Sequence, residues 1–354
     1  MRGLALHFLY ICLVAVLLPI GEMQAQMREH FLPGSTTEKY AVIFGGAAAG
    51  KKYEERFRAW SLQLHEILTV DYGYRPDQIT LLLGHGDSEE PRISGPCRRE
   101  TILETMTSLE KRVQPGDQVS FFFIGHGTSD SENAKFVIVG PDITGDVFAD
   151  LLNGFSDQDI IVVNTTSSSY PFCTALSASG RVVICATRTD AERYDTVFPH
   201  FFILALDDHA GDRDKNRRLS MFEAFLFARE KVKDWYTEQD RLPSEHPTLD
   251  DDGDGRFSTD PDPTKGEGRM AQIAYLDTLA ASSPEIMTGS PEFDALRKLT
   301  ARIQEIERSV FLLRNQKDEL AVEEYRQQIE VLLIDLARTS LKLKTLRTGL
   351  QADQ

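Results

Sequence analysis

The sequence predicts an α/β protein in which a mostly parallel β-sheet is sandwiched by helices, followed by a C-terminal α-helical hairpin or coiled coil. Three observations support this fold class. Strand-like and helix-like runs alternate along the body of the chain, the strand-like runs are continuously apolar, and segment 291–351 repeats apolar side chains at helical spacing. Continuously apolar strands that alternate with helices are typical of parallel sheets covered on both faces.

The predicted elements of the body, residues 38–285, follow one another in regular order. The first strand covers Tyr40–Phe44 and leads through a Gly/Ala turn into a helix that ends near Leu68. The later strands are expected at Gln78–Leu83, Gln118–Ile124, Ile160–Val163 and Arg181–Ala186, with a hairpin arm at Lys135–Val139 and helices at Glu100–Val113 and Ile143–Leu152. In such sheets, sites form at the carboxyl ends of the strands.

The C-terminal segment 291–351 carries two coiled-coil seams. The first consists of Leu296, Leu299, Ile303, Ile306, Val310 and Leu313, and the second of Ile329, Leu332, Leu336, Leu343, Leu346 and Leu350, with Thr339 as a weaker member. The apolar rhythm is lost between them without Gly or Pro, so an antiparallel hairpin that turns near 317–322 is expected. One unbroken helix that dimerises is the alternative, and either form could join copies of the chain into a homo-oligomer.

Charge and composition exclude some classes of protein. The chain has 39 basic and 55 acidic side chains, a formal net charge of −16, and a hydrophobic share of 41%. That share is sufficient for a full core, so general disorder is not expected. An acidic surface repels phosphate, so nucleic acid is not an expected partner.

The first 25 residues have the pattern of a secretory signal peptide. Arg2 precedes an apolar run from Leu4 to Ile20, and a short polar stretch then ends at Ala25. This order predicts cleavage after Ala25, which would give a secreted or periplasmic protein without a membrane segment. The alternative is an uncleaved N-terminal segment that anchors the chain in a membrane.

The candidate catalytic site lies where two predicted strands end. His126 follows the strand Gln118–Ile124 and is flanked by Gly125 and Gly127, and glycine lets a substrate approach the backbone and leaves an N–H for an oxyanion. The next strand runs into a cluster of hydroxyl side chains that includes Ser167. A histidine after one strand and a small nucleophilic side chain after its neighbour is the layout of a two-residue acyl-transfer site.

Three stretches resemble the legumain and caspase group of cysteine peptidases. They are YAVIFGGAAAGKKYEERFRAWSLQLHEIL at 40–68, PGDQVSFFFIGHG at 115–127 and VVNTTSSSY at 162–170. The resemblance covers roughly Tyr40 to His246 and implies a caspase-like fold. It also implies that His126 is the family's catalytic histidine and that Gly127 is its oxyanion-donating glycine.

The resemblance supplies no nucleophilic cysteine. The family's cysteine falls on Ser167, or on Thr166 when the alignment is shifted by one residue. A thiol ionises readily beside an imidazole, whereas a hydroxyl needs a base that a third group orients. We therefore expect an inactive homologue whose cleft binds a peptide, a protein or nothing. The alternative is an active endopeptidase that uses Ser167 or Cys173 with His126.

Cys173 is the alternative thiol nucleophile. Pro171 suits the start of a helix, which would place Cys173 in its first turn, where the helix dipole lowers the pKa of a thiol. Core packing or a disulfide bond to Cys97 is the simpler explanation. With Cys185, the mature chain would have three cysteines, so at most one intramolecular disulfide can form.

Segment 212–223 has the spacing of an EF-hand calcium loop. Its expected ligands are the side chains of Asp212, Asp214, Asn216, Ser220 and Glu223 and the backbone carbonyl of Arg218. The runs at 198–206 and 221–236 would form the two flanking helices. The alternative is a solvated loop before a helix, in which Ser220 is the N-cap and Glu223 completes a capping box.

Segment 250–261 is a second acidic loop. Asp250, Asp252 and Asp254 occupy the first, third and fifth positions, but Pro261 stands where an EF-hand has its closing Glu. Such dense carboxylates repel one another unless a cation or water lies between them. No cofactor is required by the predicted fold, and Ca²⁺ is the expected ligand of both loops; a flexible acidic turn is the alternative. A calcium-stabilised structural or interaction protein is therefore a further hypothesis for the whole chain.

Overall fold

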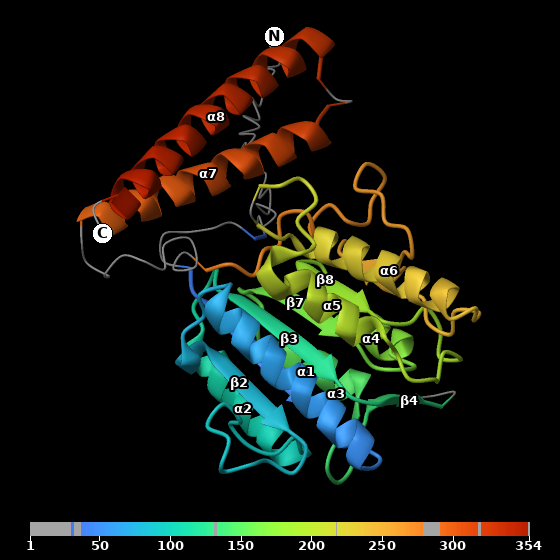
Figure 1. Cartoon of the computed structure of the whole chain (residues 1–354). Coiled ribbons are helices and arrows are strands. Elements are labelled where there is room, and N and C mark those ends of the chain that lie inside the picture. Colours follow the sequence, from blue (N-terminus) through green and yellow to red (C-terminus); the bar gives the residue numbers. More distant parts are fainter. Residues whose placement is uncertain are drawn as a thin grey trace, which may run out of the picture.

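The computed structural model describes residues 30–31, 37–130, 133–216, 218–278, 291–317 and 320–352. Its centre is a six-stranded sheet in the order β2-β1-β3-β7-β8-β9 (Figure 1). These strands are β1 Lys39–Gly45, β2 Ile79–Leu83, β3 Gln118–Ile124, β7 Asp159–Asn164, β8 Arg181–Cys185 and β9 Thr248–Asp250. Neighbouring strands are parallel except for β9, which is antiparallel to β8. The predicted α/β class with a mostly parallel sheet is confirmed.

Helices cover both faces of this sheet, as continuously apolar strands require. One face packs against α1 Lys51–Val70, α5 Phe198–Leu206 and α6 Met221–Glu238, and the other against α2 Arg99–Arg112, α3 Gly145–Leu152 and α4 Tyr170–Leu176. Two short 3₁₀ helices lie at Pro76–Gln78 and Asp207–His209. Alternate residues of each strand enter opposite cores; in β1, Ile43 faces α1 and Phe44 faces α3. The strands are therefore buried on both sides.

A small antiparallel sheet extends from the carboxyl end of β3. It consists of β4 Gly127–Ser129, β5 Ala134–Phe136 and β6 Ile143–Thr144. The predicted hairpin arm at 135–139 corresponds to β5. The predicted helix at 143–152 starts two residues later, because Thr144 is its N-cap and accepts the N–H of Val147.

The sequence does not predict β9. A run of three residues is too short to give an alternating pattern, and only its pairing with β8 defines it. That pairing sets Asp250 opposite Val183 at the edge of the sheet. The first residue of the second acidic loop is thus held by the sheet.

The C-terminal segment forms two antiparallel helices, α7 Pro291–Asn315 and α8 Val322–Ala352 (Figure 1, orange to red). An ion pair between Arg302 of α7 and Asp335 of α8, at 2.7 Å, connects them. The predicted hairpin is therefore present and the single unbroken helix is not. Glu307 of α7 contacts the α/β body through Arg218, at 2.9 Å.

The signal-peptide prediction falls on residues 1–25, which lie outside the described residues. Among the helices that the structure describes, none combines the length and the apolar character needed to cross a lipid bilayer.

Candidate functional site

The His-Gly turn and the hydroxyl cluster meet at one edge of the sheet. β3 and β7 are adjacent and parallel, with Phe123 opposite Asn164, so both chains leave the sheet on the same side. A Cβ on Gly127 would lie 2.1 Å from the backbone oxygen of Ser167 and 2.6 Å from Thr166 Oγ1. Only glycine fits that contact, so the backbone of the His-Gly turn lies directly against the hydroxyl cluster.

The imidazole of His126 lies against α1 and lacks a hydrogen bond at one nitrogen. Its ring meets the edges of the rings of Tyr53 and Phe57, at centroid distances of 4.7 and 5.0 Å. Nε2 is buried and has no hydrogen-bond partner among the residues that the structure describes. Burial lowers the pKa of His126, and the charge of Arg56 lowers it further, although Asp195 acts in the opposite direction. The ring is therefore neutral near pH 7 and a weak base.

The candidate hydroxyl nucleophiles donate their protons elsewhere. Ser167 Oγ donates to the carbonyl oxygen of Gly127 at 3.1 Å, and Thr166 Oγ1 donates to Asn164 Oδ1 at 2.8 Å. Ser167 and Thr166 are 6% and 1% exposed. Neither hydroxyl forms the bond to an imidazole nitrogen that general-base activation needs.

A loop that the sequence analysis did not single out holds the hydroxyl cluster from the other side. Ser168 donates from its backbone N to Glu192 O at 2.8 Å and from Oγ to Asp190 O at 3.1 Å. Thr196 Oγ1 donates to Thr165 O at 2.7 Å. The only signal for these contacts in the sequence would be the polar run after β8, which has no distinctive spacing.

Cys173 lies in the first turn of α4, as predicted, but it is fully buried. Burial raises its pKa, so the prediction that the helix dipole lowers it is wrong. A buried neutral thiol is a poor nucleophile. Cys97, Cys173 and Cys185 are all buried free thiols in the structure, which does not join Cys173 to Cys97.

Within the described part of the chain, a cavity lies at each end of the parallel strands. One of about 200 Å³ is close to the His-Gly turn and is lined by Ser129, Asp130, Asn133, Ala134, Thr144, Gly145, Asp146, Pro171, Ala175 and Asp190. The other, of about 470 Å³, lies between the amino ends of the strands and the C-terminal hairpin. The smaller cavity is lined by three carboxylates and lies beside the His-Gly turn, but its lining does not include His126, Thr166 or Ser167.

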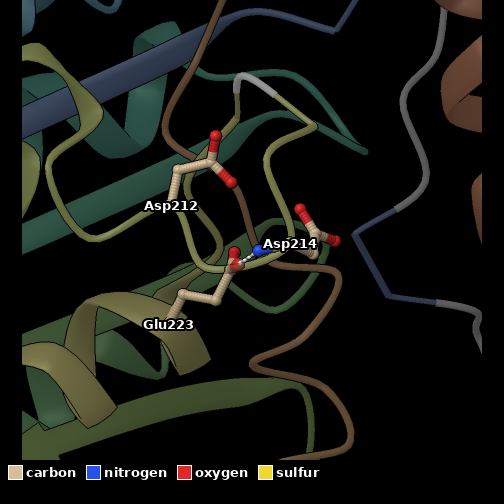
Figure 2. A group of neighbouring side chains, drawn as sticks. All are labelled: Asp212, Asp214 and Glu223. Carbon is tan, nitrogen blue, oxygen red and sulfur yellow. Dashed lines mark hydrogen bonds between the residues drawn. The ribbon is translucent and has the colours of Figure 1, made fainter.

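The first acidic loop brings together Asp212, Asp214 and Glu223 (Figure 2). Ligand atoms of these three residues lie within 4.8 Å of one another and could hold a metal ion. Glu223 also accepts the N–H groups of Arg213 and Asp214, at 3.1 and 3.4 Å. It forms the predicted capping box with Ser220 at the start of α6, so that Glu223 connects the helix to the loop.

Both acidic loops have the same pattern of hydrogen bonds. In each loop, the side chain of the first residue accepts a hydrogen bond from the backbone N–H of the fourth residue. The side chain of the third residue accepts from the N–H of the fifth, and the side chain of the fifth accepts from the N–H of the seventh. The pairs are Asp212–Lys215, Asp214–Asn216 and Asn216–Arg218 in one loop, and Asp250–Gly253, Asp252–Asp254 and Asp254–Arg256 in the other. Both loops therefore turn in the same way around their acidic side chains.

The second loop is completed by a residue that the sequence analysis missed. Ligand atoms of Asp250, Asp254 and Glu267 lie within 4.8 Å of one another, and this group could also hold a metal ion. Asp252 is not part of the group. Burial raises the pKa of Glu267 to about 9, and the charges of Asp250 and Asp251 contribute. Glu267 follows Pro261 at a distance that no fixed loop spacing predicts.

The other predicted ligands of the first loop are Asn216, Ser220 and the Arg218 carbonyl, which are not acidic side chains. Asn216 Oδ1 accepts the N–H of Arg218 at 2.7 Å, and Ser220 Oγ is used in the capping box. The side chain of Arg218 pairs with Asp277 and Glu307, which leaves the prediction for its backbone carbonyl untested.

Neither the models of known protein families nor the curated protein sequences match this chain. The resemblance to the legumain and caspase group therefore depends on the three motifs and on what the structure places around them.

Proposed function

We propose that this chain is an exported homologue of the legumain and caspase peptidases that has lost peptidase activity and binds a peptide or protein ligand. One observation carries the proposal. The hydroxyl groups of Thr166 and Ser167, at the two positions that could correspond to the family's cysteine, donate to Asn164 and Gly127 rather than to His126.

The chemistry of the pair supports inactivity. A serine or threonine hydroxyl has to transfer its proton to a base as it attacks, and that base needs an orienting partner. His126 has a lowered pKa, and its Nε2 has no hydrogen-bond partner. Oxyanion stabilisation by Gly127 alone would give only a small residual rate.

The cavity beside the turn supports the proposed ligand. Its lining includes Asp130, Asp146 and Asp190, and a pocket lined by carboxylates favours a positively charged side chain. We expect the ligand to present a lysine or arginine to this cavity. An acidic side chain there would be repelled.

A panel of fluorogenic peptides tests the loss of activity. Wild-type protein and His126→Ala are each incubated with peptides that vary at the residue before the cleaved bond, including Arg, Lys, Asn and Asp. The expected result is one background rate for both proteins. Turnover that His126→Ala abolishes would overturn the proposal. Sequencing the N-terminus of the purified protein tests export, for which a start at Gln26 is expected.

Calcium binding at the two acidic loops is the second proposed function. It is supported by the two carboxylate groups and by the shared hydrogen-bond pattern around them. Ionisation of three acidic side chains at such short range is unfavourable, and a divalent cation favours their ionised form. Sites with incomplete EF-hand spacing are expected to have the weak affinity of extracellular calcium modules.

Thermal melts in calcium and in chelator test this second function. Calcium is expected to raise the melting temperature of the wild-type protein, and Asp212→Asn and Asp250→Asn should each reduce the rise. Asp234→Asn, on the exposed side of α6, is a matched control that should keep the full rise. An identical melting temperature in calcium and in chelator would exclude a stabilising site.

A further inference from the structure

Two of the buried cysteines approach one another where β7 and β8 end. Cys185 is the last residue of β8 and stands opposite Asn164 in the register of the two strands. Cys173 follows Ser169 by four residues, and its N–H donates to the Ser169 carbonyl at 2.9 Å. Residues four apart lie on the same side of a helix, so Cys173 and Ser169 face the same neighbour.

That neighbour is Cys185. Its sulfur lies 3.2 Å from Ser169 Oγ. Cys173 lies with Cys185 in one buried apolar cluster, in which α4 packs against β8. Both cysteines have 0% exposure. Both thiols therefore lie in the same solvent-free part of the core, on either side of Ser169.

Cys97 lies in another part of the sheet. Its N–H donates to the carbonyl of Gly84, directly after β2, at 2.8 Å. In the strand order, β2 and β8 are separated by β1, β3 and β7. Four strand spacings amount to roughly 19 Å, whereas a disulfide requires Cα atoms within about 7 Å. Cys97 is therefore not a partner for Cys185.

We propose that Cys173 and Cys185 form a disulfide bond when the chain folds in the presence of a disulfide oxidant, and that Cys97 remains a free thiol. The thiolate of one cysteine attacks a sulfur of the oxidant and releases one oxidant thiol. The second cysteine then attacks the protein sulfur of this mixed disulfide and releases the other. Two protein S–H bonds become one S–S bond, and the oxidant leaves as two thiols with the two electrons and two protons.

The full burial of both sulfurs determines when this exchange takes place. No oxidant can reach them in the closed fold, so the bond forms before α4 packs onto β8. Afterwards the same burial protects it from reducing thiols. Cys97, which is also fully buried, then stays unpaired in the core.

The bond would also brace the second acidic loop. Ser177, directly after α4, donates to Asp250 Oδ2 at 2.8 Å, and Thr248 of β9 is paired with Cys185. A link between α4 and β8 therefore holds both segments that position Asp250. This role rests on the proposed calcium function, whereas the bond itself does not.

Peptide mapping of the refolded chain tests the proposal. The full chain is reduced and unfolded, refolded in a buffer of oxidised and reduced glutathione, alkylated in denaturant and digested with trypsin. Trypsin cuts after Arg181 and so separates the two cysteines. The expected product is the peptide 182–188 linked to the peptide that contains Cys173, with Cys97 alkylated. Alkylation of Cys97, Cys173 and Cys185 together, or a link that includes Cys97, would overturn the proposal.

The variant Cys97→Ser and the thermal melts in calcium distinguish failure of the disulfide proposal from failure of the calcium proposal. Cys97→Ser should keep the link, and its melting temperature should be several degrees lower when this variant is refolded with a reducing thiol alone instead of the glutathione buffer. A linked chain that does not respond to calcium would contradict only the calcium function. A chain that responds to calcium but has free Cys173 and Cys185 would contradict only the disulfide.

Discussion

Replacement of Arg218 by methionine tests how the C-terminal hairpin is held to the body. The Arg218 guanidinium makes two hydrogen bonds to Asp277, at 3.0 and 3.1 Å, and one to Glu307 of α7 at 2.9 Å. It also lies 3.7 Å from the centroid of the Tyr275 ring. The side chains of Arg218, Asp277 and Glu307 are only 15%, 6% and 23% exposed. Methionine retains most of the apolar length but leaves two carboxylates without their cation.

The burial of these three side chains determines how much free energy of unfolding the substitution should remove. Removing one partner of a buried ion pair costs about 3–5 kcal/mol, and the partial exposure of Glu307 favours the lower end of that range. Arg218→Met should therefore lower the free energy of unfolding by about 3 kcal/mol. The assay is urea unfolding at pH 7, followed by circular dichroism and by tryptophan fluorescence.

A matched variant and a rescue make the test specific. Arg302→Met removes an ion pair whose side chains are 49% and 41% exposed, so its cost should stay below about 1 kcal/mol. Adding Asp277→Asn and Glu307→Gln to Arg218→Met should recover at least half of the loss, because the unpaired charges are gone. Equal costs for Arg218→Met and Arg302→Met would refute the reasoning.

Three further predictions concern the His-Gly turn, a buried carboxyl and the acidic loops. Gly127→Ala should lower the free energy of unfolding by at least about 2 kcal/mol, because the new Cβ would overlap the Ser167 backbone. Gly95→Ala, whose new Cβ would have its nearest contact at 3.5 Å, should lower it by less than about 1 kcal/mol. Equal losses in urea unfolding would contradict the packing of this turn. Burial raises the pKa of Glu245 to about 7 from 4.5, so its contribution to stability is complete below pH 4.5 and is lost as the pH rises through 7. The free energy of unfolding of Glu245→Gln should therefore rise relative to that of the wild type by up to about 3 kcal/mol as the pH increases from 4.5 to 7. Parallel pH profiles of the two proteins in urea unfolding would count against this prediction. Calcium bound at one site, at 100 times its dissociation constant, should stabilise the folded chain by about 2.7 kcal/mol, which raises the melting temperature by on the order of 5 °C or more. If Asp250→Asn leaves this rise unchanged, the second loop is not the calcium site.

The strands could be predicted from the sequence because burial on both faces makes them continuously apolar. QVSFFFI at 118–124 and DIIVVN at 159–164 are fully buried, and both were expected as strands. β9 could not be predicted, since three residues have no period and its identity depends on pairing with β8. The ends of α3 and β8 differ by one or two residues from prediction, because caps and turns determine them.

The candidate site was predictable in its position but not in its hydrogen bonds. His126 follows β3 and Ser167 follows β7, and the two segments meet because these parallel strands are neighbours in the sheet, as the order of the elements predicts. Whether the Ser167 hydroxyl donates to an imidazole or to the Gly127 carbonyl depends on side-chain torsions that no spacing encodes. Glu267 lies beside Asp250 and Asp254 because of the path that the chain takes after Pro261. A sequence motif with fixed spacing does not predict that path.

Covalent labelling of the hydroxyl cluster tests the loss of catalysis most directly. Fluorophosphonate probes phosphonylate a serine or threonine hydroxyl only when a neighbouring base activates it. Folded wild-type protein and His126→Ala are treated with such a probe, and the peptide that contains Thr166 and Ser167 is examined by mass spectrometry. The expected result is no adduct on this peptide in either protein. A stoichiometric adduct in the wild type that is absent from His126→Ala would contradict the account.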